Sequence, residues 1–326
     1  MRLGVVIVSH QSAAHLRSCI EGCLRFANPD AGLVVVDNAS TDGSASVAGS
    51  IPSVAVLHNT ANVGFAAAVN QGFRVLESAD CVLVLNPDAE LQSDLDPLVR
   101  WLDDPSVAIA AGVLCESAGV PQRGFTLRRF PTPAALAFEN IGLNRVWPRN
   151  PVNRRWRCFD LDLTKACDAD QPAGAFLLIR RQAWARIGGF DEGFRPVWFE
   201  DVDFCVRIKE AGYRIRYEPL AIAVHLGGHS ICSLDWCQRQ LYWYGNLLRF
   251  AGLHFRPWGL LLVALTVGFG AAIRGSWEAL RRGSVAPLRV VGVVLRLAAA
   301  APRTSVRPVH CAGSPGHSGV ATTERG

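Results

Sequence analysis

Lysine and paired cysteines are nearly absent from the sequence. Of its 33 basic residues, 31 are arginine and only Lys165 and Lys209 are lysine, a bias typical of GC-rich coding and hence of a bacterial source rather than of a function. The ten cysteines include no Cys-x-x-Cys pair, so neither a zinc site nor a disulfide framework is indicated. Reduced thiols in a cytosolic compartment are therefore expected.

Long apolar runs are missing as well. Residues 257–273 form an uncharged apolar stretch, but its 17 residues fall short of the roughly 20 that a membrane-spanning helix needs. Arg2 is followed directly by the apolar run 3–8, which fits a buried strand rather than a secretory segment. Half of the 326 residues are hydrophobic, so the chain can form one large domain, or a domain with an extension, and global disorder is excluded.

Charge is unevenly distributed along the chain. The formal net charge is +5, but residues 254–326 hold nine arginines and only two glutamates, which leaves the preceding residues slightly acidic. A basic excess confined to the apolar C-terminal region suggests an anionic membrane surface as a partner, and no nucleic acid is expected.

Apolar runs alternate with helical spacing through the first 90 residues. Strands are predicted at 3–8, 33–36, 54–57 and 81–85, and helices at 16–24 and 65–76. This alternation predicts an α/β fold, with a mostly parallel central sheet and helices on both faces. Ligands of such sheets bind beyond the carboxyl ends of the strands, where Ser9, Asp37 and Asp88 all fall, so one shared site is expected.

Residues 115–170 differ from the sequence around them. They hold eight arginines and five prolines, which predicts long loops and short helices inserted over the site. The arginines are Arg123, Arg128, Arg129, Arg145, Arg149, Arg154, Arg155 and Arg157. Further along, strands are predicted at 174–179 and 214–217, and helices at 181–187, 200–211 and 236–250.

The C-terminal region combines apolar and basic residues. Residues 280–297 mix Val and Leu with four arginines, as in a basic amphipathic helix. Together with 257–273 they predict attachment in the plane of an anionic membrane, and a helical hairpin packed on the domain is the alternative. The expected organisation is a domain over 1–250, a membrane-associating extension over 251–303 and a disordered tail over 304–326.

Two segments offer polar groups at the predicted sheet edge. Asp37 opens the sequence VVVDNASTDGS, where it can accept a pyrimidine N3–H or form an Asx turn. Asn62 precedes a glycine turn, and Asn70 lies on the second turn of the helix that follows. The N–H groups at such a helix start can face a phosphate or a sugar, with simple capping as the alternative.

Asp88 and His225 form a candidate cation site. Asp88, in LNPDAE, follows a strand and a proline turn, and can bind a divalent cation that bridges a pyrophosphate, although such an Asp is usually a turn residue. His225, in VHLGGHS, ends a strand beside two glycines and can complete a metal site, whereas a lone His is more often structural.

Three carboxylates lie inside an apolar frame in the sequence GGFDEGFRPVWFEDVDFC. They are Glu200, Asp201 and Asp203, and the frame consists of Phe194, Trp198, Phe199 and Phe204. A helix start that favours acids accounts for the first two carboxylates but not for the aromatic frame. Partly desolvated carboxylates shift their pKa towards the range of a catalytic base.

Taken in order, these motifs resemble those of glycosyltransferase family 2, which has the nucleotide-sugar-dependent glycosyltransferase A fold. The matching stretches include VVIVSHQSAAHL, VVVDNASTDGS, NVGFAAAVNQGF, LNPDAE, PAGAFLLIRRQAWARIGGFDEGF, FEDVDFCVRIKEAGY and HLGGHS, and they span residues 3 to about 230. Bacterial rhamnosyltransferase-like members are the most similar, because they often carry Asn-Pro-Asp where relatives have Asp-x-Asp.

The resemblance implies which residues hold the donor, a dTDP- or UDP-sugar. They would be Ser9, Asp37, Asn62, Gly64, Asn70 and Asp88. Ser9 and Asp37 would contact the base and ribose. Asp88 would bind Mg2+ or Mn2+ on the diphosphate, with His225 as a second ligand.

The resemblance also implies an inverting transfer. Asp201 would be the general base, supported by Glu200 and Asp203, and Trp198 and Gly174 would lie on the acceptor side. The arginine-rich insert could contact an acceptor pyrophosphate or form a solvated loop surface. With the basic tail, it predicts a polyprenyl-diphosphate-linked glycan acceptor at the inner face of the cell membrane, in cell-surface polysaccharide synthesis.

Two alternatives belong to other functional classes. A nucleotide-sugar pyrophosphorylase needs a Gly-rich phosphate loop after the first strand, but residues 9–18 read SHQSAAHLRS, without glycine. A membrane-bound scaffold with a degenerate transferase fold would be favoured by loss of Asp88 or Asp201, and both are present. Asn86 departs from the Asp-x-Asp of the wider family, which removes one potential metal ligand.

Overall fold

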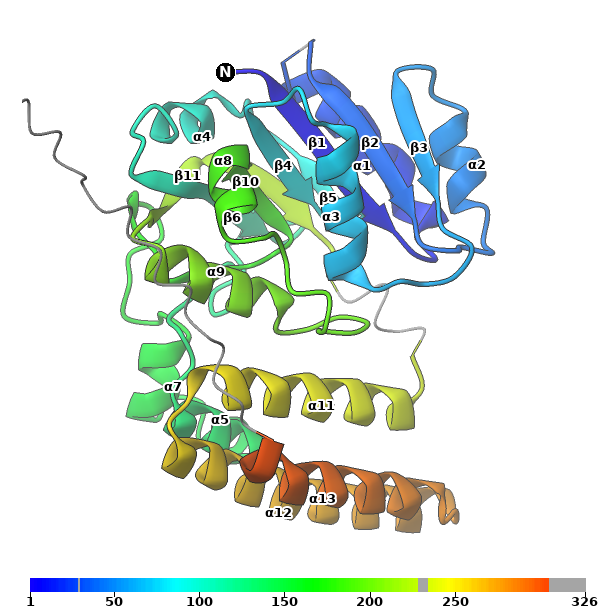
Figure 1. Ribbon diagram of the computed structural model, residues 1–326, viewed down its shortest axis with the longest axis vertical. Coiled ribbons are helices and arrows are strands. Elements are labelled where there is room, and N and C mark those ends of the chain that lie inside the picture. Colours follow the sequence, from blue (N-terminus) through cyan, green and yellow to red (C-terminus); the bar gives the residue numbers. More distant parts are fainter. Residues whose placement is uncertain (29, 228–233, 305–326) are drawn as a thin grey trace, which may run out of the picture.

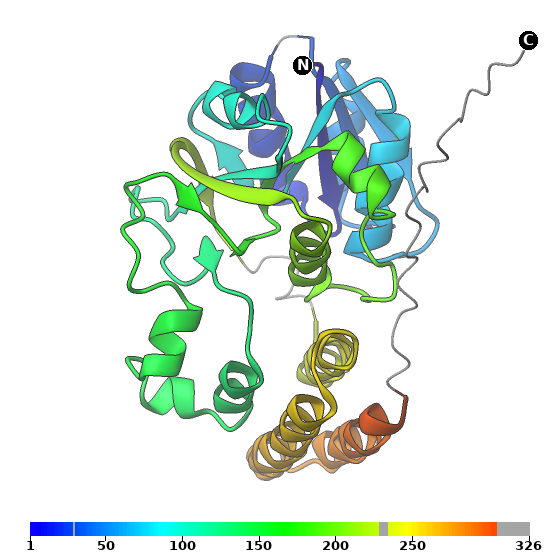
Figure 2. The same cartoon turned by 60° about the vertical axis from the view of Figure 1, so that its left-hand side comes forward.

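The computed structural model describes residues 1–28, 30–227 and 234–304. Figure 1 shows a sheet with its covering helices in the upper part of the view and a separate layer of long helices below it. A segment of short helices from the middle of the chain stands beside this lower layer (Figure 2).

The central sheet follows the order β3-β2-β1-β4-β10-β6-β11-β5, with β8 paired beside β11. Its strands are β1 (Leu3–Ser9), β2 (Gly32–Asp37), β3 (Val54–His58), β4 (Cys81–Leu85), β5 (Ala89–Leu91), β6 (Val107–Cys115), β8 (Cys167–Asp168), β10 (Phe176–Arg180) and β11 (Arg214–His225). β1 to β4 are parallel to one another, whereas β10 runs antiparallel between β4 and β6. The predicted mostly parallel sheet is confirmed, with β10 and β5 making it mixed.

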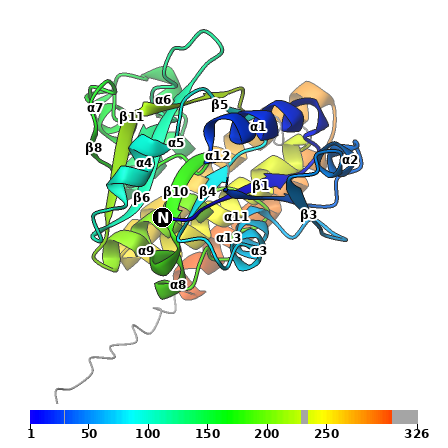
Figure 3. The ribbon, with the colours of Figure 1, turned by 90° about the horizontal axis from the view of Figure 1, so that it is seen from above.

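Helices cover both faces of this sheet, as predicted (Figure 3). One face carries α1 (Ala13–Phe26), α2 (Ser44–Gly49) and α4 (Asp96–Trp101), and the other carries α3 (Phe65–Val75), α8 (Arg181–Arg186) and α9 (Glu200–Glu210). Successive residues of β1 alternate between the two cores, Val5 in one and Val6 in the other. This alternation explains why the central strands are apolar throughout.

The insert forms short elements, as its prolines predicted. They are β7 (Leu127–Arg128), α5 (Pro133–Asn140), α6 (Leu143–Val146), α7 (Pro151–Trp156) and β9 (Gln171–Pro172), with β7 paired to β9. Thr132 caps α5 and Asn150 caps α7, each followed by a proline at the first helical position. The caps set where these helices begin because a side-chain oxygen binds a free backbone N–H.

The C-terminal layer consists of α11 (Trp236–His254), α12 (Pro257–Arg282) and α13 (Ala286–Thr304). These helices share a third apolar core, to which the segment before α9 contributes Phe194 and Phe199. α11 runs across the predicted domain boundary at residue 250. The extension therefore packs directly on the segment that carries the three carboxylates.

The prediction of one basic helix over 280–297 is wrong. α12 continues to Arg282 and ends at Gly283, whose φ of +59° lies in the left-handed region that glycine adopts readily. Arg281 and Arg282 therefore close α12, and α13 begins only after this turn. The predicted disordered tail, apart from Thr304 in α13, falls outside the residues that the structure describes.

Candidate active site

Ser9 and Asp37 lie side by side at the carboxyl ends of β1 and β2, which are paired in register at this point. Both side chains are buried. Among the described residues, Ser9 Oγ and Asp37 Oδ1 have no hydrogen-bond partner, whereas Asp37 Oδ2 accepts from the Ser40 amide at 3.2 Å. Because a buried polar atom without a partner costs free energy, this pair fits the N–H and hydroxyl groups of a nucleoside.

Asn62 and Gly64 shape the turn that enters α3. Asn62 Oδ1 accepts the Gly64 amide at 2.9 Å, and the Asn62 side chain is exposed. Gly64 has a φ of +88°, and a Cβ at this position would lie 3.2 Å from the Pro196 carbonyl oxygen. Asn38 anchors the same turn, donating to the Gly64 carbonyl oxygen at 3.3 Å, although the sequence did not single it out.

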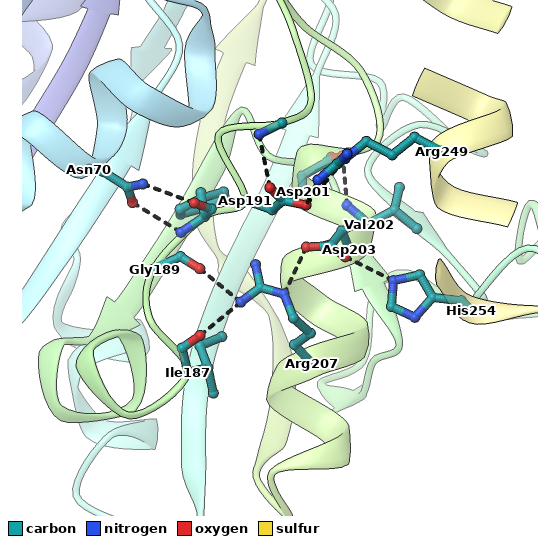
Figure 4. Close-up of polar contacts among 12 residues, drawn as sticks. Asn70, Ile187, Gly189, Asp191, Asp201, Val202, Asp203, Arg207, Arg249 and His254 are labelled. Atoms are coloured by element: carbon teal, nitrogen blue, oxygen red, sulfur yellow. Dashed lines mark hydrogen bonds and ion pairs between the residues drawn. The ribbon is translucent and has the colours of Figure 1, made fainter. Parts of the chain in front are cut away.

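Asn70, which was predicted to line the donor pocket, forms its hydrogen bonds to residues 184–192. Its side chain is buried against the segment that precedes α9, with Nδ2 donating to the Phe190 carbonyl oxygen and to Glu192 Oε1. Figure 4 shows the Asn70 amide facing this segment. Asn70 Oδ1 accepts from the Phe190 amide and from Trp184 Nε1. Since both ends of the amide are engaged, the geometry favours Asn70 as a residue that fixes this segment rather than as a contact for the donor.

Asp88 and His225 are brought together by the pairing of β5 with β11. His225 Nε2 lies 3.4 Å from Asp88 Oδ1, both side chains are buried, and His225 Nε2 has no hydrogen-bond partner within the described chain. The other imidazole nitrogen lies 3.1 Å from Gln122 Oε1, and Phe125 stacks on the ring at 5.2 Å. Burial raises the pKa of Asp88, but the adjacent His225 outweighs it and holds the pKa below its ordinary value.

These two side chains fit a divalent cation. Ligands bound about 2.1 Å from one ion lie about 3 Å from each other, close to the separation of Asp88 and His225. The described part of the chain contains no group of three metal-ligating side chains. A cation here would therefore take its remaining ligands from water and from a bound diphosphate.

Asp201 faces a cavity of about 260 Å³ between α9, β9 and the insert. Asp201 Oδ2 accepts the Gly174 amide at 3.0 Å, and Oδ1 accepts the Val202 amide at 2.8 Å (Figure 4). Burial raises the pKa of Asp201 above its ordinary value, although these two amides and Arg128 oppose the shift. A carboxylate with a raised pKa in a cavity is suited to accept a proton.

Glu200 borders the same cavity but is more deeply buried. Its Oε2 has no hydrogen-bond partner among the residues described. Burial, followed by the charge of Asp201, raises the pKa of Glu200 well above its ordinary value. Of the two carboxylates, Asp201 therefore carries the negative charge more readily.

Asp203, predicted to support the base, does not line this cavity. It is buried with Oδ2 accepting Arg207 Nε at 2.8 Å and Oδ1 lying 2.8 Å from His254 Nε2 (Figure 4). Arg207 in turn donates to the carbonyl oxygens of Ile187 and Gly189. Asp203 thus connects α9, the helix that carries Asp201, to the C-terminal end of α11.

The aromatic frame joins the cavity to α11. Trp198 lines the cavity and meets Trp243 edge to face at 5.7 Å. Trp198 and Phe199 have φ values of +83° and +72°, which cost on the order of 1–3 kcal/mol each in a non-glycine residue. Such strain persists only where packing holds it, and here Trp243 and Phe250 of α11 pack on Phe199.

Gly174 packs tightly against the Asp201 carboxylate. A Cβ on Gly174 would lie 2.9 Å from Asp201 Cβ and 3.2 Å from Oδ2. We expect Gly174→Ala to displace the carboxylate and lower kcat about 10- to 100-fold, because displacements near 1 Å cost this much in catalysis. The measurement is kcat together with the thermal midpoint.

Gly245→Ala in α11 is the control for this prediction, since a Cβ there meets no atom within 4 Å. It should leave both kcat and the thermal midpoint near those of the unaltered protein. Equal rates for the two variants would show that the tight approach of Gly174 to Asp201 has no part in catalysis.

Comparison with known proteins gives consistent matches. A family model described as glycosyl transferase family 2 matches residues 4–184, and one described as glycosyl transferase family group 2 matches residues 163–312. N-acetylglucosaminyl-diphospho-decaprenol L-rhamnosyltransferase of Mycobacterium tuberculosis is 29% identical over 248 residues, covering 70% of this chain and 77% of that protein.

Two further matches are more distant. Rhamnosyltransferase WbbL of Escherichia coli K12 is 26% identical over 153 residues, which is 46% of this chain and 53% of that protein. The crystal structure of GalNAc-T7 with UDP, GalNAc and Mn2+ superposes with a TM-score of 0.56 at 14% identity, over 78% of this chain and 48% of that one. At this identity the likeness to GalNAc-T7 concerns the fold alone.

Proposed function

Because the chain belongs to glycosyltransferase family 2 and is a glycosyltransferase, we propose that it moves rhamnose or a similar sugar from a nucleoside-diphosphate sugar to a lipid-linked glycan. The observation that carries this proposal is Asp201, a carboxylate of raised pKa that borders the cavity and is fixed by the Gly174 amide. The names of two relatives, both rhamnosyltransferases, support the choice of sugar.

The proposed reaction is a single inverting displacement. The acceptor oxygen forms a bond to the anomeric carbon, the bond from that carbon to the donor phosphate breaks, and Asp201 takes the hydroxyl proton. A cation held by Asp88 and His225 would supply charge stabilisation for the departing nucleoside diphosphate. The unpartnered atoms of Ser9 and Asp37 would bind the base and ribose of a dTDP- or UDP-sugar.

We place the acceptor on a polyprenyl diphosphate. The M. tuberculosis relative is named for an N-acetylglucosaminyl-diphospho-decaprenol substrate, which supports this class. α5 connects the cavity to the C-terminal layer, since Glu139 lines the cavity and Asn140 donates to Thr266 of α12 at 3.3 Å. A lipid chain leaving the cavity along α5 would reach α12, which is long and apolar enough to cross a membrane.

The surface of α12 supports attachment to a membrane. By length and composition α12 could cross a membrane, but half of its most apolar window is buried in the protein. Seven of its exposed apolar side chains recur every three or four residues and so form one stripe: Trp258, Leu261, Leu265, Phe269, Ile273, Trp277 and Leu280. Exposed Arg289 and Arg296 on α13 add positive charge beside it. We infer that the stripe lies in the cytoplasmic face of the cell membrane.

Replacing Leu265 and Phe269 together by glutamate should lower binding to phosphatidylglycerol vesicles at least tenfold. Burying each such side chain contributes about 1.5–3 kcal/mol, and the new charges would oppose insertion. Co-sedimentation with vesicles measures the effect. Leu220→Glu, at an exposed apolar position of β11, is the control. Equal binding by both variants would mean that α12 packs only on protein.

A donor screen tests the proposed function. The protein is incubated with dTDP-rhamnose and several UDP-sugars, Mg2+ and a prenyl-diphosphate-linked N-acetylglucosamine, and nucleoside diphosphate release is followed with product analysis. Release coupled to a glycosylated acceptor is expected. If no donor stabilises the protein thermally and no nucleoside diphosphate is released, a scaffold function would be favoured. In a parallel incubation of each donor with inorganic pyrophosphate, formation of a sugar phosphate and a nucleoside triphosphate would indicate a pyrophosphorylase.

A further inference from the structure

Two arginines of the insert share the Asp201 cavity. Among the eight arginines of residues 115–170, Arg128 and Arg157 are the two that line it, together with Trp156. Arg128 lies over the Trp156 ring at 5.7 Å and Arg157 at 5.2 Å. We propose that Arg128, Arg157 and the Trp156 indole form a subsite for the phosphoryl group of the acceptor, an inference that rests on the proposed function.

The charge of the pair is only partly balanced. Arg157 lies 3.5 Å from Glu139, and Arg128 Nε donates to the uncharged Gly124 carbonyl oxygen at 2.7 Å. Within the described chain no ion pair joins Arg128 to a carboxylate. Burial, followed by the charge of Arg157, lowers the pKa of the Arg128 guanidinium to about 10, although the charges of Asp201 and Glu139 oppose this shift. Two guanidinium groups that repel each other in a cavity favour an anion between them.

Trp156 gives an independent indication of a ligand. Trp156 is only 6% exposed, and its indole Nε1 has no hydrogen-bond partner among the described residues. An indole N–H is a donor only, so a buried one is normally paired with an acceptor. A phosphoryl oxygen would be such an acceptor, and guanidinium forks bind phosphate with two parallel hydrogen bonds.

The remaining arginines of the insert are engaged or solvated. Arg129 forms a bidentate ion pair with Asp160, with both N–O distances at 2.8 Å. Five others are exposed: Arg123, Arg145, Arg149, Arg154 and Arg155. Arg128 and Arg157 therefore differ from the other arginines of the insert, because they line the cavity beside Trp156 and do not belong to a general basic surface.

The position of the pair suits an acceptor. Asp88 and His225, the proposed site of the donor diphosphate, do not line this cavity, whereas Asp201 does. An acceptor sugar whose hydroxyl reaches Asp201 would carry its phosphoryl group towards the insert, and the lipid beyond it towards α5 and α12. A phosphoryl group of the donor is the other source of the same chemistry, and the experiment separates the two.

The test compares two acceptors with the Arg128→Gln and Arg157→Gln variants. One acceptor is farnesyl-diphosphate-linked N-acetylglucosamine, and the other is a neutral alkyl N-acetylglucosaminide. Each variant should lower kcat/KM for the diphosphate acceptor about 10- to 100-fold, as expected for a lost charge-assisted contact, and should change it much less for the neutral acceptor. Arg154→Gln, on the exposed side of α7, is the matched control and should match the unaltered protein.

An equal loss with both acceptors, or a matching rise in the KM of the donor, would overturn the assignment and place the arginines at the donor. Titration of the full chain with farnesyl diphosphate alone gives a readout that needs no turnover. Both Gln variants should bind it at least tenfold more weakly, and unchanged binding overturns the subsite. Failure of the unaltered protein to use any donor, with arginine-dependent binding of farnesyl diphosphate, would refute the proposed function and leave the subsite standing.

Discussion

Asp201→Asn is expected to lower kcat by about 10²- to 10⁴-fold, the range that a positioned general base contributes. The amide retains the shape of the carboxylate and an oxygen that can accept the Gly174 N–H, although its nitrogen then faces the Val202 N–H, which loses its acceptor. The fold and donor affinity should persist, with a small fall in the thermal midpoint. What is lost is the ability to take the proton from the acceptor hydroxyl. Product formation under saturating donor and acceptor measures the change, and donor binding is followed separately by thermal stabilisation.

The pH profile gives a second signature of the same base. Asp201 acts only when ionised, and burial raises its pKa, so kcat/KM should fall on the acid side at a higher pH than an exposed aspartate would give. In Asp201→Asn the residual rate should lack this acid limb. Undiminished transfer by the variant, or an unchanged acid limb, would remove Asp201 from the role of base.

Asp203→Asn is the matched comparison on the same helix. Because Asp203 pairs with Arg207 and lies 2.8 Å from His254 Nε2, its neutralisation leaves Arg207 without its counter-charge and removes the carboxylate beside His254. Breaking a buried pair costs about 3–5 kcal/mol, so the thermal midpoint should fall while the acid limb of the pH profile remains. The two variants thus separate loss of a base from loss of a tie between helices.

The features predicted from the sequence are those with short-range causes. Apolar runs determined the buried strands, and parallel pairing then placed Ser9 beside Asp37 without any knowledge of side-chain contacts. Asp88 and His225 were named separately, and only the pairing of β5 with β11 brings them together. The β5 strand has three residues, too short for a periodic pattern, and was not predicted.

Roles that depend on distant partners could not be predicted. Asn70 binds Phe190, 120 residues away, and Asp203 meets His254 on a helix of the extension. The contact of Asp203 with Arg207 at a spacing of four was visible in the sequence and could have marked a structural role. Gly283 likewise could have marked the end of α12. Which two of eight arginines reach the cavity follows from how the insert folds, which no local pattern records.

Asp88→Asn is expected to lower kcat/KM about 100-fold or more and to weaken the response to Mn2+. Among the described residues, the candidate cation site offers the Asp88 carboxylate and the His225 imidazole, and a hard divalent ion prefers the carboxylate. Asn86 already lacks the second acid of the wider family, so no neighbouring carboxylate on the same turn replaces Asp88. Rates at graded Mn2+ concentrations, after treatment with a chelator, measure the shift.

Glu90→Gln provides the control for this prediction, because Glu90 is an exposed acid two residues further along. It removes the same unit of charge near the site without removing a candidate ligand. If Asp88 binds the cation, the Mn2+ requirement should rise in Asp88→Asn and stay constant in Glu90→Gln. A similar rise in the Mn2+ requirement of both variants would mean that the cation responds to the overall negative charge of this region and is not bound by Asp88. With only two protein ligands, Mn2+ affinity should also rise when UDP or dTDP is present, since the nucleotide diphosphate supplies the missing oxygens.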